Sequence, residues 1–108
     1  MNAQDRGLLE RHFQQQVIHL AHLCGWRVAH FRPAQNARGD WRTAVAADGR
    51  GFPDLVLARD RIIFAELKTA TGRLSPHQKA WRLALTTSGA EYHLWRPEDF
   101  DAIQEALK

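Results

Sequence analysis

Apolar residues in the first quarter of the chain recur with the period of an α-helix. Over residues 8–24 they fall on one stripe of such a helix, made of Leu9, Phe13, Val17, Leu20, Ala21 and Cys24. Gly25 follows at a position where helices commonly end. The pattern predicts a helix over residues 8–24 whose stripe faces the core.

Short apolar runs after this helix predict strands. They cover residues 26–31, 54–58, 61–68 and 92–95, and residues 42–47 could form another short strand. Residues 62–65 are apolar at every position, which is typical of a strand covered on both faces. We therefore expect a sheet sandwiched between helices.

Two further helices are predicted in the second half. Ser75 and Pro76 suit the cap and the first turn of a helix that ends at Gly89. Its buried stripe is predicted to be Trp81, Ala84, Leu85 and Ser88. Pro97 opens the last helix, whose apolar face carries Phe100, Ile103 and Leu107. The order α-β-β-β-α-β-α predicts an α/β fold with a mixed central sheet flanked by helices.

Composition places this chain among small globular domains. It has 108 residues, 44% of them hydrophobic, so we expect one domain over residues 1–108. The single cysteine, Cys24, excludes an internal disulfide and fits a reducing compartment. No apolar run has the length of a membrane span, and the first residues lack a secretion signal, so we expect a cytoplasmic protein of a bacterium or a phage.

Charge changes this picture only slightly. The formal net charge is +3 and the isoelectric point is near 9.6. This excess is compatible with a phosphate-bearing partner, and equally with an ordinary solvated basic surface.

Two carboxylates and a lysine stand at the ends of the two central strands. Asp54 opens the first strand, and Glu66 and Lys68 lie two residues apart on the second. Strand side chains alternate, so Glu66 and Lys68 share one face. Carboxylate oxygens hold a hard cation, and a nearby lysine positions a water or offsets developing negative charge. The trio predicts a Mg²⁺-dependent phosphodiester hydrolase, although strand-end charges are often only solvated rims.

The order of these motifs resembles a known nuclease family. Pro53-Asp54 followed by Glu66-Leu67-Lys68 resembles the PD-(D/E)xK nuclease superfamily. The wider string adds the run from Gly51 to Leu57 and the run from Gly72 to Trp81. Together these are similar to the VRR-NUC family over nearly the whole chain. The resemblance implies a restriction-endonuclease-like core, a bound Mg²⁺ or Mn²⁺ (one ion or two) and a DNA substrate.

The resemblance also implies further metal ligands. The backbone carbonyl of Leu67 would join Asp54 and Glu66. Glu10 lies inside the apolar arc of the first helix, so it either has a partner or bends to water near a frayed helix start. Many nucleases of the superfamily carry an acidic residue from the first helix into the metal site, which favours Glu10 as a third carboxylate.

Gln78 has two interpretations. In Ser75-Pro76-His77-Gln78 it can complete a capping box with Ser75. The family resemblance instead places this glutamine beside the metal. Gln78 also lies on the same helix face as Leu85, which points toward the sheet, so we favour the active-site interpretation. One residue should not fill both roles well.

Basic residues predict a DNA-binding surface on the long connection. Residues 32–51 are rich in small and polar residues, and Trp41 lies among four arginines, Arg32, Arg38, Arg42 and Arg50. His30 and Lys79 are further candidates for phosphate contact. His30 could instead order a water, and a hydrogen-bonded histidine at the rim of the sheet is an equally good interpretation. A solvated loop whose tryptophan packs on the core is almost as good an interpretation. By contrast, His12, His19 and His22 lie on the wet side of the first helix and do not predict a zinc site.

These features predict a stand-alone, structure-selective DNA endonuclease. The family suggests branched DNA such as four-way junctions, cut by a homodimer whose two sites match the two strands. Two alternatives remain at this point: a non-catalytic DNA-binding module, and a nuclease subunit that is active only within a larger complex.

Overall fold

The computed structural model describes residues 3–31, 34–35, 37–39, 41–42 and 45–108. The helices are α1 (Ala3–Leu23), α2 (Pro76–Thr87) and α3 (Phe100–Leu107), with a 3₁₀ turn η1 (Pro97–Asp99) before α3. The strands are β1 (Arg27–His30), β2 (Ala34–Gln35), β3 (Trp41–Arg42), β4 (Leu55–Ala58), β5 (Ile62–Leu67) and β6 (Glu91–Trp95). The predicted α/β order is confirmed, with the small β2–β3 hairpin added to it.

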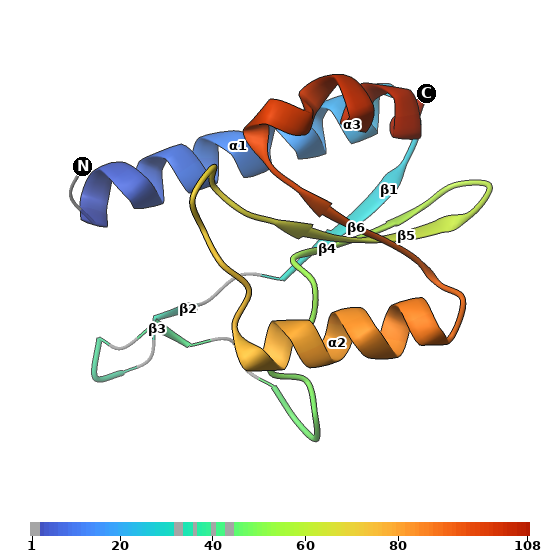
Figure 1. Cartoon of the computed structure of the whole chain (residues 1–108). Helices are drawn as coiled ribbons and strands as arrows, with labels where there is room; N and C mark the ends of the chain where they lie inside the picture. The colour runs from blue at the N-terminus through green and yellow to red at the C-terminus, as the bar shows by residue number, and fades with distance from the viewer. Residues whose placement is uncertain (1–2, 32–33, 36, 40, 43–44) are drawn as a thin grey trace.

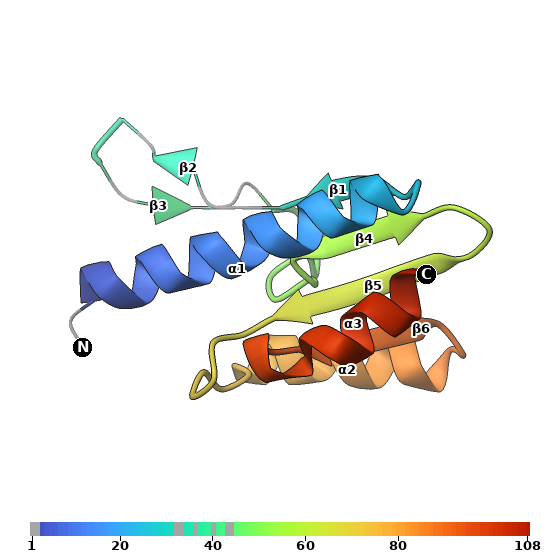
Figure 2. The same cartoon turned by 90° about the horizontal axis from the view of Figure 1, so that it is seen from above.

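Four strands form the central sheet, in the order β1-β4-β5-β6. β1 and β5 both pair antiparallel with β4, whereas β6 pairs parallel with β5. Helices α1 and α3 lie on one face of this sheet and α2 on the other (Figures 1 and 2). The antiparallel register of Leu55 with Ala65 brings the beginning of β4 beside the end of β5.

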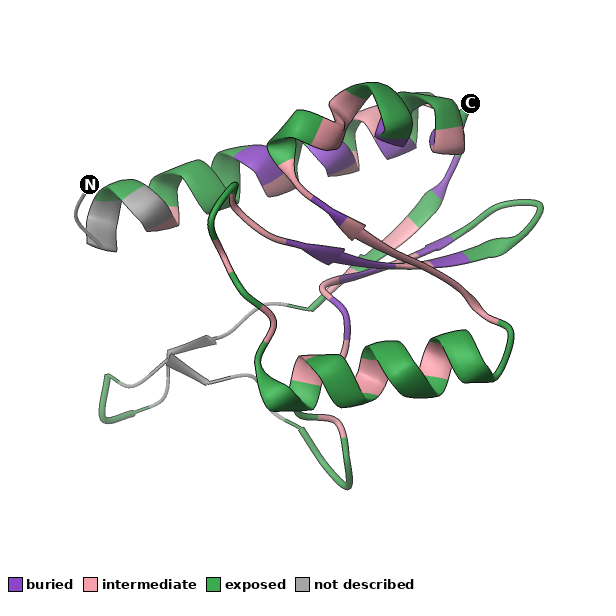
Figure 3. Cartoon of the chain, viewed as in Figure 1, coloured by how far each residue is buried: buried purple, intermediate pink, exposed green. Residues whose placement is uncertain are grey.

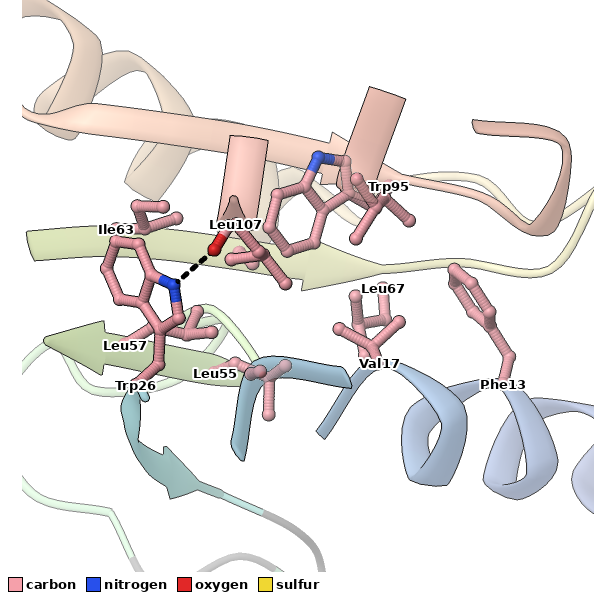
Figure 4. Packing of buried hydrophobic residues seen from close by; sticks show 12 residues of the cluster. Phe13, Val17, Trp26, Leu55, Leu57, Ile63, Leu67, Trp95 and Leu107 are labelled. Carbon is pink, nitrogen blue, oxygen red and sulfur yellow. Dashed lines mark hydrogen bonds between the residues drawn. The ribbon is translucent and has the colours of Figure 1, made fainter. Parts of the chain in front are cut away.

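The buried core lies between the sheet and the α1–α3 layer (Figures 3 and 4). Alternate residues of β4 and β5 point into it, and α1 and α3 close it from above. Its fully enclosed side chains include Val17, Leu55, Leu57, Ile63, Ile103 and Leu107. Of the four tryptophans in the sequence, Trp26 and Trp95 are buried here.

The face that carries α2 is covered less completely than the sequence predicts. Ile62, expected inside a strand covered on both faces, is 56% exposed, and α2 has no buried residue among its described positions. The predicted buried stripe of α2 is wrong for Ala84 and Ser88, which are exposed, while Trp81 and Leu85 are half-buried. A single helix of twelve residues covers only part of this face, and Ala84 instead lines a surface cleft.

Helix α1 begins five residues earlier than its apolar pattern predicts. Leu9, placed on the buried stripe, is 48% exposed, because this part of α1 extends past the sheet (Figure 2). Phe13, Val17 and Ala21 form the buried part of the stripe. The strand suggested over residues 42–47 is limited to Trp41–Arg42 among the described residues, and residues 43–44 lie outside them.

Three side chains cap the carboxyl end of α3. The Trp26 indole Nε1 donates to the Leu107 carbonyl at 2.9 Å (Figure 4), and Arg61 donates to the Ala106 carbonyl. Arg59 lies over the Trp26 ring and donates to the carbonyls of Leu107 and Lys108. Helix carbonyls at a carboxyl end lack partners within the helix, so these bonds fix α3 on the core.

We expect a Trp26→Phe variant to be less stable by about 1 kcal/mol, a loss of about 4–8 °C in melting temperature. The variant removes the indole hydrogen bond and some buried volume, while Arg59 still reaches the Leu107 carbonyl. Thermal unfolding followed by circular dichroism measures the change. An unchanged melting temperature would show that the indole bond does not hold α3.

Among the described residues, no helix has the length and apolar character that crossing a membrane requires.

Candidate active site

Asp54, Glu66 and Lys68 meet at one end of the sheet, on the face that carries α2. The β4–β5 register, continued by one residue, places Asp54 opposite Glu66. Asp54 Oδ2 accepts a hydrogen bond from the Leu67 amide at 2.9 Å. Lys68 Nζ lies 3.6 Å from Glu66 Oε2. The structure therefore brings together the three residues that the motif predicts.

The two carboxyl groups lie opposite each other in neighbouring strands, and one of them is buried. Glu66 is only 2% exposed, and Asp54 is half-buried. Burial, and then the negative charge of Asp54, raise the pKa of Glu66 to about 8. Burial also raises the pKa of Asp54, against the opposing effects of the Leu67 amide and the Lys68 charge. Near pH 7 the Glu66 carboxyl group therefore holds a proton, and the site favours the approach of a positive charge.

Gln78 completes the capping box and also contacts the Glu66 carboxyl group. Its backbone N–H donates to Ser75 Oγ at 3.2 Å, and its Oε1 accepts from the Ser75 amide at 2.8 Å. Its Nε2 donates to Glu66 Oε2 at 3.0 Å. The expectation that one residue could not do both is wrong, because the amide oxygen and the amide nitrogen serve different partners.

Glu10 is exposed, although it lies on the same side of α1 as the buried Val17. It stands well inside the helix, away from its first turn. Its negative charge contributes to the raised pKa of Asp54, so the two carboxyl groups are near enough to interact through space. Within the part of the chain that the structure describes, no three His, Cys, Asp or Glu side chains lie close enough to hold one metal ion. Glu10 as a direct metal ligand stays a prediction.

The pair formed by Asp54 and Glu66 fits a hard divalent cation. Mg²⁺ is commonly bound through one or two carboxylates, with waters completing its coordination. Here the buried Glu66 and the half-buried Asp54 repel each other when both are charged, and a cation would relieve that repulsion. The donor set is oxygen-rich and lacks sulfur, as Mg²⁺ and Mn²⁺ require.

The predicted DNA contacts fall into separate groups. Arg38, Arg50 and Lys79 are exposed. His30 pairs with Leu55 on the face toward α1, and its Nε2 is buried. Arg32 lies outside the described residues. Arg42 belongs to β3, but its side chain and that of Trp41 also lie outside the described part.

The histidines of α1 are exposed, as predicted: His12, His19 and His22.

Tyr92 is a site neighbour that the sequence did not reveal. In β6 it lies beside Phe64, on the same sheet face as Glu66. Burial and the charge of Glu66 raise the pKa of Tyr92 to about 12, while the charge of Arg82 on α2 opposes this. Only the parallel register of β6 with β5 shows this proximity, and no local sequence pattern predicts that register.

Comparison with known proteins supports the family resemblance. The family model described as the VRR-NUC domain matches residues 4–97, most of the chain. A comparison with curated proteins gave no match.

Proposed function

Because the chain belongs to the VRR-NUC family, whose members carry a nuclease-type domain, we propose that it is a Mg²⁺- or Mn²⁺-dependent DNA endonuclease. The observation that supports this most strongly is the buried Glu66 carboxyl group, which has Asp54 opposite it and Lys68 beside it. Carboxyl groups with raised pKa values lower the stability of the fold near neutral pH, and such groups are concentrated at functional sites.

Asp54 and Glu66 would hold the cation, together with the Leu67 carbonyl and, in our proposal, Glu10. A bound Mg²⁺ or Mn²⁺ supplies Lewis acidity toward the scissile phosphate and makes a water more acidic. Lys68 lies on the solvent side of Glu66 and is 15% exposed, so its ammonium group can meet substrate. It orients the attacking water or stabilises the negative charge that develops on the phosphate.

DNA would approach across the amino end of α2. A cleft of about 660 Å³ lies between the loop around Arg50 and the exposed side of α2, and His77 is part of its lining. Arg50 belongs to the lining of this cleft, and Arg38 and Lys79 are further exposed basic residues that would meet the same DNA. We propose that this surface follows the phosphate backbone in branched DNA, such as a four-way junction, within the cytoplasm of a bacterial cell.

The exposed Arg50 and Lys79 should contribute to DNA affinity through counterion release. Replacing both Arg50 and Lys79 by alanine is expected to lower the salt dependence of binding by about two counterions. Fluorescence anisotropy at several salt concentrations measures this slope. Lys108→Ala removes an exposed charge at the far end of α3 and is the control. If the double variant keeps the parent slope, this surface does not contact DNA.

A metal-dependent cleavage assay on the purified chain tests the proposed activity. Linear, flap, fork and four-way DNA are each incubated with Mg²⁺ or Mn²⁺, and with chelator as control. Cleavage of branched substrates supports the proposal. Binding without cleavage favours a DNA-binding module, and cleavage only after adding cell extract favours a subunit of a larger complex.

We further propose a homodimer, because resolving a four-way junction needs two cuts on symmetry-related strands and one such site cuts one strand. Light scattering gives the mass of the free protein, and a cruciform plasmid reports paired nicks. A monomer, or a dimer that prefers flaps, would remove the junction assignment and leave the nuclease assignment standing.

A further inference from the structure

The first turn of α2 is fastened to the Glu66 carboxyl group by a single side chain. Gln78 Oε1 is occupied by the Ser75 amide at 2.8 Å. The other end of the same amide group, Nε2, therefore turns to Glu66 Oε2 at 3.0 Å. The capping box thus determines which end of the Gln78 amide faces the site.

The Glu66 carboxylate needs protein partners to orient it because it is buried. It is 2% exposed, so water does little to orient it. A carboxylate that binds metal must present its oxygens within a fraction of an ångström, and partners that hold ligands in place often affect metal affinity as much as weak ligands do. The Gln78 hydrogen bond occupies Oε2, and Lys68 Nζ lies 3.6 Å from the same oxygen.

Gly51 allows the first turn of α2 to pack closely against the segment that leads into β4. Its φ is +81°, and a Cβ at this position would lie 2.5 Å from the His77 carbonyl carbon and 2.7 Å from the Gln78 nitrogen. Both of those atoms belong to the backbone and cannot move aside without shifting the helix. Gly51 lies three residues before Asp54, so the segment that carries one carboxylate packs directly on the turn that orients the other.

We propose that Ser75 and Gly51 are positioning residues for the Glu66 carboxylate, both acting through Gln78. This inference rests on the proposed function for its catalytic meaning. Its structural content, that Ser75 and Gly51 hold the Gln78 amide on Glu66, can be tested in metal-free protein.

The first measurement follows the Gln78 side-chain amide protons by NMR without metal. In the parent they should exchange slowly with solvent. Ser75→Gly keeps the backbone N–H that donates to Gln78 Oε1 but removes the hydroxyl that holds the Gln78 backbone N–H, so we expect the Gln78 amide to be held less firmly and to exchange faster. Ser75→Thr should restore the parent signals. Parent-like Gln78 signals in Ser75→Gly would overturn the proposal even if the chain proves not to be a nuclease.

The second measurement uses Mg²⁺ and Mn²⁺ affinity by calorimetry. Gln78→Ala should weaken binding by roughly 10- to 100-fold, as for other partners of metal ligands. Ser75→Gly should weaken it by roughly several-fold, and should add nothing in the Gln78→Ala background. If the losses of metal affinity in the two single variants instead multiply in the double variant, Ser75 acts by a route other than Gln78. Absence of metal binding by the parent would refute the proposed function alone, because the NMR result stands separately.

Matched controls separate positioning from general damage to α2. Ser88→Ala removes a hydroxyl that bonds the Leu85 carbonyl at the other end of the same helix. Gly89 has φ +85° and open space around its missing Cβ, whereas Gly51 has a similar φ and a backbone collision. Gly51→Ala should therefore disturb the Gln78 signals and metal affinity, and Gly89→Ala should lower stability alone. Equal effects of the two alanines would overturn the role of Gly51.

Discussion

The Glu66→Gln variant is expected to lose metal-dependent cleavage by roughly 10³-fold or more, while its metal-free form becomes more stable than the parent above pH 7. Glutamine keeps the shape of the protonated glutamic acid. Its oxygen can accept from Gln78 Nε2, as Glu66 Oε2 does in the parent. The substitution removes a negative charge that a cation needs and that the metal-free protein disfavours.

The pH dependence of stability follows from the raised pKa of Glu66. The unfolded chain ionises this group near 4.5, and the folded protein ionises it at about 8. Between these pH values the folded state holds more protons than the unfolded state, so stability falls as the pH rises. The raised pKa of Asp54 acts in the same direction. Glu66→Gln should remove most of this decline, a gain on the order of a few kcal/mol at pH 8.

Thermal unfolding in chelator from pH 5 to pH 9 measures the effect, and calorimetry with Mn²⁺ measures the lost metal site. Glu105→Gln is the control, because Glu105 is exposed on α3 and pairs with Lys108. Asp54→Asn should behave like Glu66→Gln. Parent-like metal affinity in Glu66→Gln would contradict the ligand assignment, and a parent-like pH profile would contradict the buried charge pair.

The central part of the site could be predicted because it depends on local pattern. The apolar strands on either side of Arg59-Asp60 leave room for a tight turn, and a tight antiparallel turn fixes the register. That register places Asp54 opposite Glu66, and period two places Lys68 on the same face. Neither relation needs a contact between distant parts of the chain.

The second role of Gln78 could not be predicted in the same way. Its capping box is local and was visible in the sequence. Its bond to Glu66 depends on how closely α2 approaches the sheet, which Gly51 decides through contact with the helix backbone. Tyr92 shows the same limit, because its proximity to Glu66 depends on the register of a parallel strand that follows a helix.

The sequence predicts more burial on the α2 face of the sheet than the structure has, again because the packing of helices on the sheet is not a local property. An apolar strand such as β5 predicts cover on both faces, yet the amount of cover depends on how many helices pack there. Two helices, α1 and α3, cover one face of the described sheet, and α2 alone lies on the other (Figure 1). Ile62 is exposed as a result, although its sequence context resembles that of the buried Ile63.

Lys68→Ala is expected to reduce the rate of cleavage by roughly 10²–10⁴-fold, with a much smaller loss of DNA affinity. Lys68 Nζ lies 3.6 Å from Glu66 Oε2, and the side chain is 15% exposed. We therefore expect its charge to act on the reaction at the site more than on overall DNA affinity. Removing it also removes a charge that lowers the pKa values of both Asp54 and Glu66. The acidic limb of the pH–rate profile should therefore move to higher pH.

Single-turnover rates at saturating metal and DNA, measured from pH 6 to pH 9.5, separate these two effects. If Lys68 only eases ionisation of the carboxylates, the variant should recover the parent rate at high pH and high metal. If it acts on the water or the phosphate, the rate deficit should persist there, which is the result we expect. Lys79→Ala provides the contrast, because an exposed lysine that only meets the DNA backbone should weaken binding and leave the single-turnover rate unchanged. A large loss of affinity in Lys68→Ala with a parent-like rate would instead identify Lys68 as a phosphate contact, since an interaction made only in the transition state lowers the rate without lowering ground-state binding.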